Sequence, residues 1–173
     1  MSVNPTSIET RTEPPVTTVR DIMTADVVFV TPNTSVARIA ELMDARAISG
    51  MPVVDDARRV IGIVTDLDII IRNTRIEAPP FLPLLEGRIP LETPGHFQRR
   101  VRHMVGTEAG DVMTEEVLTI GPDEDVETLA ELMVKNKINL VPVVEGGLLA
   151  GVVSRADVVR WMTRDHAAAQ PTP

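Results

Sequence analysis

Asp21-Ile22-Met23-Thr24 decides the fold, because it returns as Asp111-Val112-Met113-Thr114, an offset of 90 residues from position 21 to position 111. Further segments recur in the same order, which is the signature of an internal repeat. The pair Gly62–Thr65 with Gly151–Ser154 has an offset of 89. The one-residue deletion falls where a hairpin loop is expected, and loops tolerate deletions. The other matching pairs are Pro32 with Pro122, Ile39–Met43 with Leu129–Met133, Pro52–Val54 with Pro142–Val144, and Gly62–Thr65 with Gly151–Ser154.

Each copy predicts the same order of elements, βαββα. Apolar residues at positions i, i+3, i+4 and i+7 indicate one buried helix face, for example Val36, Ile39, Ala40 and Met43. Two apolar runs joined by a polar turn predict a hairpin. The expected elements of the first copy are a strand at Val27–Val30, a helix capped by Thr34 or Ser35, a hairpin of Gly50–Val54 and Val60–Val64, and a helix from Thr65.

One small sheet cannot cover both helices of such a short unit, so we expect the two copies to pack through their sheets with pseudo-twofold symmetry. The fold class is α+β (α/β), and the two units should share one inseparable core. Thr93-Pro94 resembles a cap followed by a proline at the first helical position. The expected division is a flexible tail at 1–18, the first repeat at 19–73, a long connection at 74–107 with a helix at 95–105, the second repeat at 108–163, and a flexible tail at 164–173.

The composition narrows the function classes. The chain has 173 residues, a net charge of −8, no cysteine and only 2% aromatic residues. Its core must be aliphatic, and the acidic balance argues against general nucleic-acid binding. The absence of cysteine excludes disulfides and thiolate sites. No stretch is apolar enough for a signal peptide or a membrane span, so a cytoplasmic protein without membrane association is expected.

Polar residues with a possible role follow each hairpin. Thr65-Asp66-Leu67-Asp68 and Ser154-Arg155-Ala156-Asp157 both fit Ser/Thr-x-x-Asp at the junction of a strand and a helix. On spacing alone this is a capping box, which is common in any protein. The start of a helix is also favourable for phosphate, and an Asp can accept hydrogen bonds from both hydroxyls of a ribose. The two interpretations are compatible, and the repetition favours a role in binding.

These motifs together resemble a pair of cystathionine-β-synthase-type (CBS) domains, a Bateman module. The resemblance rests on Val19–Thr24 and Gly110–Thr114 as opening motifs, on Ser49–Val54 and Asn139–Val144 as middle strands, and on the two Ser/Thr-x-x-Asp endings. It implies two clefts that bind AMP, ADP, ATP or another adenosyl compound such as S-adenosylmethionine or NAD.

The resemblance also implies roles for individual residues. Asp68 and Asp157 would bind ribose hydroxyls, with Thr65 and Ser154 near phosphate. Thr31 and Ile120 would line the same clefts. The segments expected to enclose adenine are Ile48, Ser49, Gly50, Met51 and Pro52, and Ile138, Asn139, Leu140, Val141 and Pro142.

The two copies differ in charge beside the expected phosphate position. Arg155 stands where the first copy has Asp66. A guanidinium attracts phosphate and a carboxylate repels it. The sequence therefore predicts that the Asp157 cleft is the better nucleotide site and that the Asp68 cleft is weak or empty.

The leading hypothesis is a regulatory sensor, and the alternative is a ligand-free structural or interaction module. No catalytic set is present, so we expect no enzyme, no required cofactor and no metal site, although His96 and His103 could share a helix face. The resemblance further implies a homodimer, which a monomer in light scattering would contradict, and a separate effector protein as a possible partner.

Overall fold

The computed structural model describes residues 17–72, 81–84, 87–90 and 106–169. The expected helix at 95–105, with His96 and His103, lies outside these residues, as does nearly all of the expected N-terminal tail. The expected mixed fold of helices and strands is confirmed. The elements in chain order are α1 Val19–Ile22, α2 Val36–Arg46, β1 Gly50–Val54, β2 Val60–Thr65, α3 Asp66–Arg72, β3 Phe81–Leu84, β4 Gly87–Pro90, α5 Ala109–Val112, α6 Val126–Asn136, β5 Leu140–Glu145, β6 Leu148–Ser154 and α7 Arg155–Ala169.

Three antiparallel hairpins make up the strands of the described chain: β1–β2, β3–β4 and β5–β6. The first and last are the expected repeat hairpins, and each carries a bulge at the equivalent place, after Val53 and after Val143. The hairpin β3–β4 pairs Phe81 with Pro90 inside the segment that we expected to be a connection. No pattern in the sequence predicted this hairpin.

The strand expected at Val27–Val30 is wrong in extent, since only Val30 forms a bridge, parallel to Val53. The N–H of Val30 donates to the Pro52 carbonyl, and the N–H of Val54 donates to the Val30 carbonyl. The next bond of a parallel ladder would need a donor at Pro52, and proline has no N–H. Ile120 pairs with Val143 beside Pro142 in the same way. The repeated proline therefore ends the ladder after one bridge.

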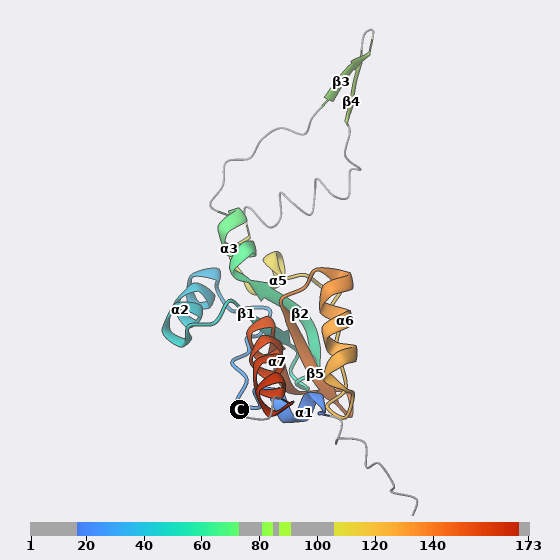
Figure 1. Ribbon diagram of the computed structural model, residues 1–173. Coiled ribbons are helices and arrows are strands. Elements are labelled where there is room, and N and C mark those ends of the chain that lie inside the picture. The colour runs from blue at the N-terminus through green and yellow to red at the C-terminus, as the bar shows by residue number, and fades with distance from the viewer. Residues whose placement is uncertain (1–16, 73–80, 85–86, 91–105, 170–173) are drawn as a thin grey trace, which may run out of the picture.

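The short first helix of each repeat packs on the other repeat. In Figure 1, α1 lies beside α6 and α7 of the second repeat, while α5 lies beside β2 and α3 of the first. The N–H of Val19 donates to the Glu124 carbonyl at 2.8 Å, and the N–H of Ala109 donates to the Thr34 carbonyl at 2.8 Å. The two repeats thus exchange their opening helices.

The residues that follow these helices extend the exchange to the sheets. Thr24 and Val152 form two backbone hydrogen bonds, of 2.9 and 3.0 Å, and Thr114 and Ile63 form the equivalent pair at 2.9 and 3.0 Å. The second strand of each repeat hairpin, β2 or β6, is therefore paired on its other side with one residue from the other repeat.

The N-terminal cap of α1 lowers the pKa of Asp21. The N–H and the hydroxyl of Thr18 both donate to Oδ2 of Asp21 at 2.8 Å. These hydrogen bonds, led by the one from the backbone, hold the pKa of Asp21 below its usual value. The carboxylate therefore stays charged at the N-terminus of the helix, where a negative charge is favourable.

The buried residues form two clusters rather than the single core that we expected. The first joins Ile39, Met51 and Val64 of the first repeat to Ala109 and Val112 of α5. The second joins residues of the second repeat, Leu129 and Val141 among them, to Val19 of α1. The repeats are nevertheless inseparable, because each cluster is completed by a helix of the other repeat.

Gly62 and Gly151 permit this close packing. A Cβ at Gly62 would meet the side chain of Met113, with its Cγ at 2.9 Å, and a Cβ at Gly151 would lie 2.6 Å from Met23 Sδ. These approaches are shorter than van der Waals contact, so a methyl group would force the opposing segment away.

We expect Gly62→Ala to lower the free energy of unfolding by about 1–3 kcal/mol, since overpacking a close contact costs this much. Chemical denaturation measures the effect, and Met113→Ala in the same chain should recover part of it. Gly121→Ala is the matched control, because a Cβ there meets Glu124 Cγ at an ordinary 3.6 Å. Equal losses in the two alanine variants would contradict the role of Gly62.

Candidate functional site

Two clefts of similar size lie at the junction of the repeats. The Asp157 cleft has a volume of about 650 Å³, and the Asp68 cleft about 760 Å³. Volumes of this order are typical of small-molecule sites. The Asp157 cleft is lined by Thr24, Asp26, Val27, Val28, Ala47, Ile48, Ser49, Gly50, Pro52, Asn139, Leu140, Val152, Ser154, Arg155, Ala156, Asp157 and Val159. The Asp68 cleft is lined by Ser49, Ile63, Thr65, Asp66, Leu67, Asp68, Thr114, Glu116, Val117, Leu118, Asn136, Lys137, Ile138, Asn139 and Leu140.

Each cleft combines parts of both repeats. The start of α7 faces the chain that leads into β1, and the start of α3 faces the chain that leads into β5. Ser49, Asn139 and Leu140 line both clefts, so these residues form a common wall between them. Gly50 and Leu140 are equivalent positions, and a Cβ at Gly50 would lie 3.2 Å from Leu140 Cδ2. The side chain of Leu140 thus fills space next to Gly50.

The two Ser/Thr-x-x-Asp motifs form nearly identical structures. The N–H and hydroxyl of Thr65 donate to Asp68 Oδ2, both at 2.8 Å. Those of Ser154 donate to Asp157 Oδ2 at 2.8 and 2.6 Å. The capping interpretation is therefore realised in both repeats, and it fixes each carboxylate at the edge of its cleft.

Asp157 keeps acceptor capacity beyond its capping role. Its Oδ1 accepts one hydrogen bond from Arg160 Nη1 at 2.9 Å, while Oδ2 accepts the two from Ser154. A carboxylate offers about four lone-pair positions. One position on Oδ1 is thus left for a hydroxyl donor in the cleft, where the Asp157 side chain is 13% exposed.

The first N–H group of α3 already has an acceptor, and so has the first N–H group of α7. Asp66 N–H donates to the Ser49 carbonyl and Arg155 N–H to the Asn139 carbonyl, both at 2.9 Å. A phosphate at these helices would therefore depend on N–H groups further into the first turn and on side chains. The same bonds tie the common wall to the starts of α3 and α7.

The structure brings most of the predicted site residues together, but not all of them. Thr65, Asp68, Ile138, Asn139 and Leu140 share one cleft. The other holds Ile48, Ser49, Gly50, Pro52, Ser154, Arg155 and Asp157.

The remaining predicted residues lie elsewhere. Met51 and Val141 are 0% exposed and face the two hydrophobic clusters. Pro142 and Thr31 do not line either cleft, and Ile120 lines a separate cavity. The alternation of a β-strand explains Met51 and Val141, because neighbouring residues point to opposite faces.

Sequence reasoning missed the wall formed by the segment after each opening motif. Asp26, Val27 and Val28 line the Asp157 cleft, and the equivalent Glu116, Val117 and Leu118 line the Asp68 cleft. These residues are left outside the sheet because Pro52 and Pro142 end the ladder. The signal in the sequence was the proline of the repeated Pro-Val-Val motif, one residue before the position that pairs with Val30 or Ile120.

Ala47 and Lys137 were also missed. Both end a helix in the left-handed conformation, with φ of 51° and 56°, which turns the chain sharply from α2 and α6 toward the clefts. The equivalent positions therefore place an alanine in the lining of the Asp157 cleft and a lysine in that of the Asp68 cleft.

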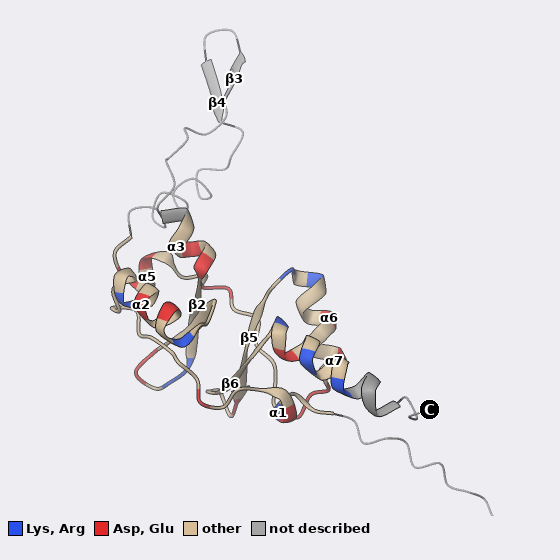
Figure 2. Ribbon diagram, turned by 60° about the vertical axis from the view of Figure 1, so that its left-hand side comes forward, with Lys and Arg blue, Asp and Glu red and all other residues tan. Residues whose placement is uncertain are grey.

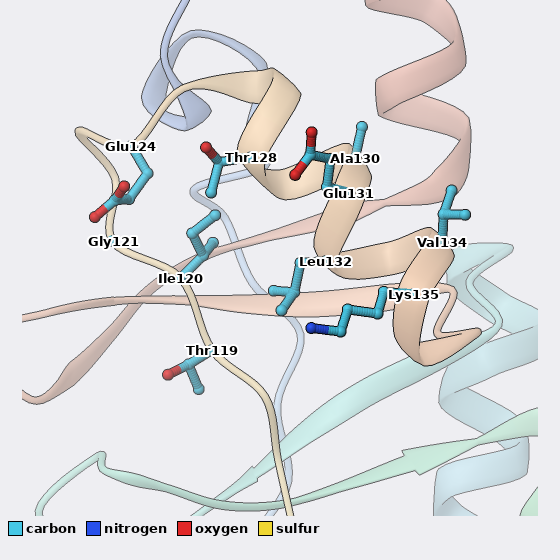
Figure 3. Close-up of a pocket in the computed structure, with 10 residues that line it drawn as sticks. All are labelled: Thr119, Ile120, Gly121, Glu124, Thr128, Ala130, Glu131, Leu132, Val134 and Lys135. Carbon is cyan, nitrogen blue, oxygen red and sulfur yellow. The ribbon is translucent and has the colours of Figure 1, made fainter.

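A third cavity, of about 870 Å³, lies away from the repeated polar motifs. Figure 3 shows Ile120 and Leu132 between α6 and the segment that carries Thr119 and Gly121. Although its volume is larger, its lining residues all come from the second repeat, whereas each of the two clefts combines both repeats. We therefore place the candidate site in the two clefts.

Within the residues that the structure describes, no group of three His, Cys, Asp or Glu side chains could hold a metal ion. Over the same residues, no helix is long and apolar enough to cross a membrane.

A family model described as the CBS domain matches residues 19–72 and again residues 109–164. Protein MJ1426 of Methanocaldococcus jannaschii is 31% identical, over 82% of this chain and 88% of that protein. The chloroplastic CBS domain-containing protein CBSX2 of Arabidopsis thaliana is 30% identical, over 83% of this chain and 62% of the plant protein. A crystal structure of CBSX2 in complex with AMP has a TM-score of 0.72 at 28% identity, covering 85% of this chain and 97% of that one.

Proposed function

Because this chain belongs to the CBS domain family, we propose that it binds an adenine nucleotide in the Asp157 cleft and acts as a regulatory module rather than as a catalyst. AMP, ADP and ATP share the groups that this cleft can recognise. The observation that carries the proposal is the assembly of Asp157, Arg155 and the Ile48–Gly50 segment, from two repeats, around one cavity.

Each part of a nucleotide has a matching group. The free lone pair of Asp157 Oδ1 accepts a ribose hydroxyl, and Arg155 and the Ser154 hydroxyl lie at the start of α7 to receive phosphate. The backbone of Ile48–Gly50 and the apolar side chains of Val27 and Val28 flank the base. The likeness to CBSX2, whose crystal structure contains AMP, supports this class of ligand.

A regulatory role follows from the composition of the cleft. A ligand that touches α7 and the start of β1 contacts both repeats, so its binding energy depends on how the repeats are placed relative to each other. A ligand shifts such an equilibrium by its difference in affinity for the two arrangements. A separate effector protein would respond to that arrangement.

A homodimer would cover apolar side chains that a single chain leaves exposed. Leu67 and Ile70 on α3 are 59% and 57% exposed, and Val159 and Met162 on α7 are 52% and 44% exposed. The two residues on each helix are three positions apart and so lie on one face, and exposed apolar side chains gathered in this way are typical of protein interfaces. We place the module in the cytoplasm, with no required cofactor.

Thermal or chemical denaturation in the presence of AMP, ADP, ATP and S-adenosylmethionine tests the proposed function. A ligand at about 100 times its Kd should raise the free energy of unfolding by about 2.7 kcal/mol. Inorganic phosphate at equal concentration is the control for non-specific anion effects. If none of the four compounds changed the stability, the ligand-free scaffold would be the better interpretation.

A further inference from the structure

The Asp68 cleft keeps the groups for an adenosine moiety. Thr65 and Asp68 reproduce the geometry of Ser154 and Asp157, with hydrogen bonds of 2.8 Å to Asp68 Oδ2. The segment Ile138–Leu140 stands where the other cleft has Ile48–Gly50. The part of the cleft that would meet ribose and base is thus conserved between the two repeats.

The charge of the Asp68 cleft is unsuited to phosphate. Asp66, Asp68 and Glu116 line it, with Lys137 as the cation. In the Asp157 cleft, Asp26 and Asp157 are partly offset by Arg155. An anionic group therefore meets a larger excess of negative charge in the Asp68 cleft, even when Lys137 is included. At the separations within a cleft, such a difference changes binding measurably.

The helix at the Asp68 cleft reinforces this difference. The first turn of α3 carries Asp66 and Asp68, and Figure 2 shows this acidic start. The first turn of α7 carries Asp157 as its one acidic residue. The positive end of α3 is thus already neutralised by two carboxylates.

An apolar side chain stands near the expected phosphate position. Leu67 follows Asp66 in the first turn of α3, lines the cleft and is 59% exposed, whereas the equivalent residue in the other cleft is Ala156. Leu118, on the facing segment, is 42% exposed. Alkyl or thioether groups gain from such surroundings, and a phosphate does not.

We propose that the Asp68 cleft takes an adenosine derivative without phosphate, neutral or cationic at its 5′ substituent, while the Asp157 cleft takes the nucleotide. This inference rests on the proposed function, since it assigns different ligand classes to the two clefts of one module. The sequence predicted that the Asp68 cleft is weak or empty. The inference limits this prediction to nucleotides, which bind there weakly because they carry phosphate.

Isothermal titration of the full-length protein with AMP and with 5′-methylthioadenosine tests the inference. In Asp157→Ala, which disables the nucleotide cleft, we expect methylthioadenosine to bind at least about 10-fold more tightly than AMP. In Asp68→Ala the order should reverse. Adding Asp66→Arg to the Asp157→Ala chain should strengthen AMP binding by about 10-fold and change methylthioadenosine binding far less, because only AMP carries the phosphate.

The reciprocal variant Arg155→Asp, added to Asp68→Ala, is the matched control and should weaken AMP binding by a similar factor. Equal affinity of Asp157→Ala for both compounds, tighter binding of AMP, or no binding of either would overturn the inference while leaving a nucleotide site at Asp157. If the unmodified protein bound neither AMP nor methylthioadenosine, the proposed function itself would fail.

Discussion

Replacing Asp157 with alanine is expected to weaken AMP binding by about 10- to 100-fold, the cost of losing a hydrogen bond to a charged acceptor. The Asp157 side chain is only 13% exposed and is held by Ser154 and Arg160, so its carboxylate is fixed in position at the cleft. Asp68→Ala should leave AMP affinity nearly unchanged. Calorimetric titration of both variants measures the difference.

Two controls separate the loss of ligand contacts from the loss of the helix cap. Asp157→Ala also removes the capping bonds of Ser154, which costs about 1 kcal/mol of stability, so each variant must be shown to be folded at the titration temperature. Arg160→Ala removes the partner of Asp157 Oδ1 without touching the residues that line the cleft. The assignment fails if Asp157→Ala binds AMP normally and Asp68→Ala does not bind it.

Replacing Leu129 with alanine is expected to lower the free energy of unfolding by about 2–5 kcal/mol, the usual cost of truncating a buried leucine. Leu129 is 0% exposed and belongs to the cluster that Val19 of α1 completes. Because helices are exchanged, Val19→Ala should disturb the same cluster. We therefore expect the effects of Leu129→Ala and Val19→Ala to be non-additive, although the residues lie in different repeats.

The control pairs Val19→Ala with Ile39→Ala. Ile39 is also 0% exposed and lies in the same sequence repeat as Val19, but it belongs to the other cluster. Substitutions without shared neighbours add within about 0.3–0.5 kcal/mol. Denaturant titration of the single and double variants gives both coupling energies. Coupling of Val19 to Ile39 and not to Leu129 would exclude the exchange of opening helices.

Much of the fold was predictable because local patterns repeat. The hairpins at Gly50–Thr65 and Leu140–Ser154, and the helices α2 and α6, follow from apolar periodicity and from turns rich in polar residues. Ser35 was one of the two residues predicted as the cap of α2, and it accepts the Arg38 N–H at 3.2 Å. Each of these features depends on residues close together in sequence.

The partners of the opening helices could not be predicted in this way. The motif at Asp21–Thr24 differs between the copies only by Ile22 in place of Val112, so nothing in its residues indicates whether it packs on its own repeat or on the other. The answer lies in backbone bonds between residues far apart, such as Val19 with Glu124. Likewise, periodicity gives no sign that Pro52 removes the donor on which the expected strand depended.

For the candidate site, the motifs predicted the polar residues but not how they combine. Asp157 and Ser154 were expected to act together, and they do share a cleft. That this cleft is closed by Ile48–Gly50 of the other repeat follows only from how the two units are placed. Lys137 and Glu116, which set the charge of the Asp68 cleft, come from helix and loop ends that carry no motif.

The exchange of helices also sets an order on how the chain can fold during synthesis. The first cluster lacks Ala109 and Val112 until they are made, about 2 to 8 s after the end of α3 at typical rates of translation. The nascent first repeat thus exposes an apolar surface that only a later part of the same polypeptide can cover. Such long-range closure favours slow folding, and it makes this interval the period in which a chaperone would be most useful to the protein.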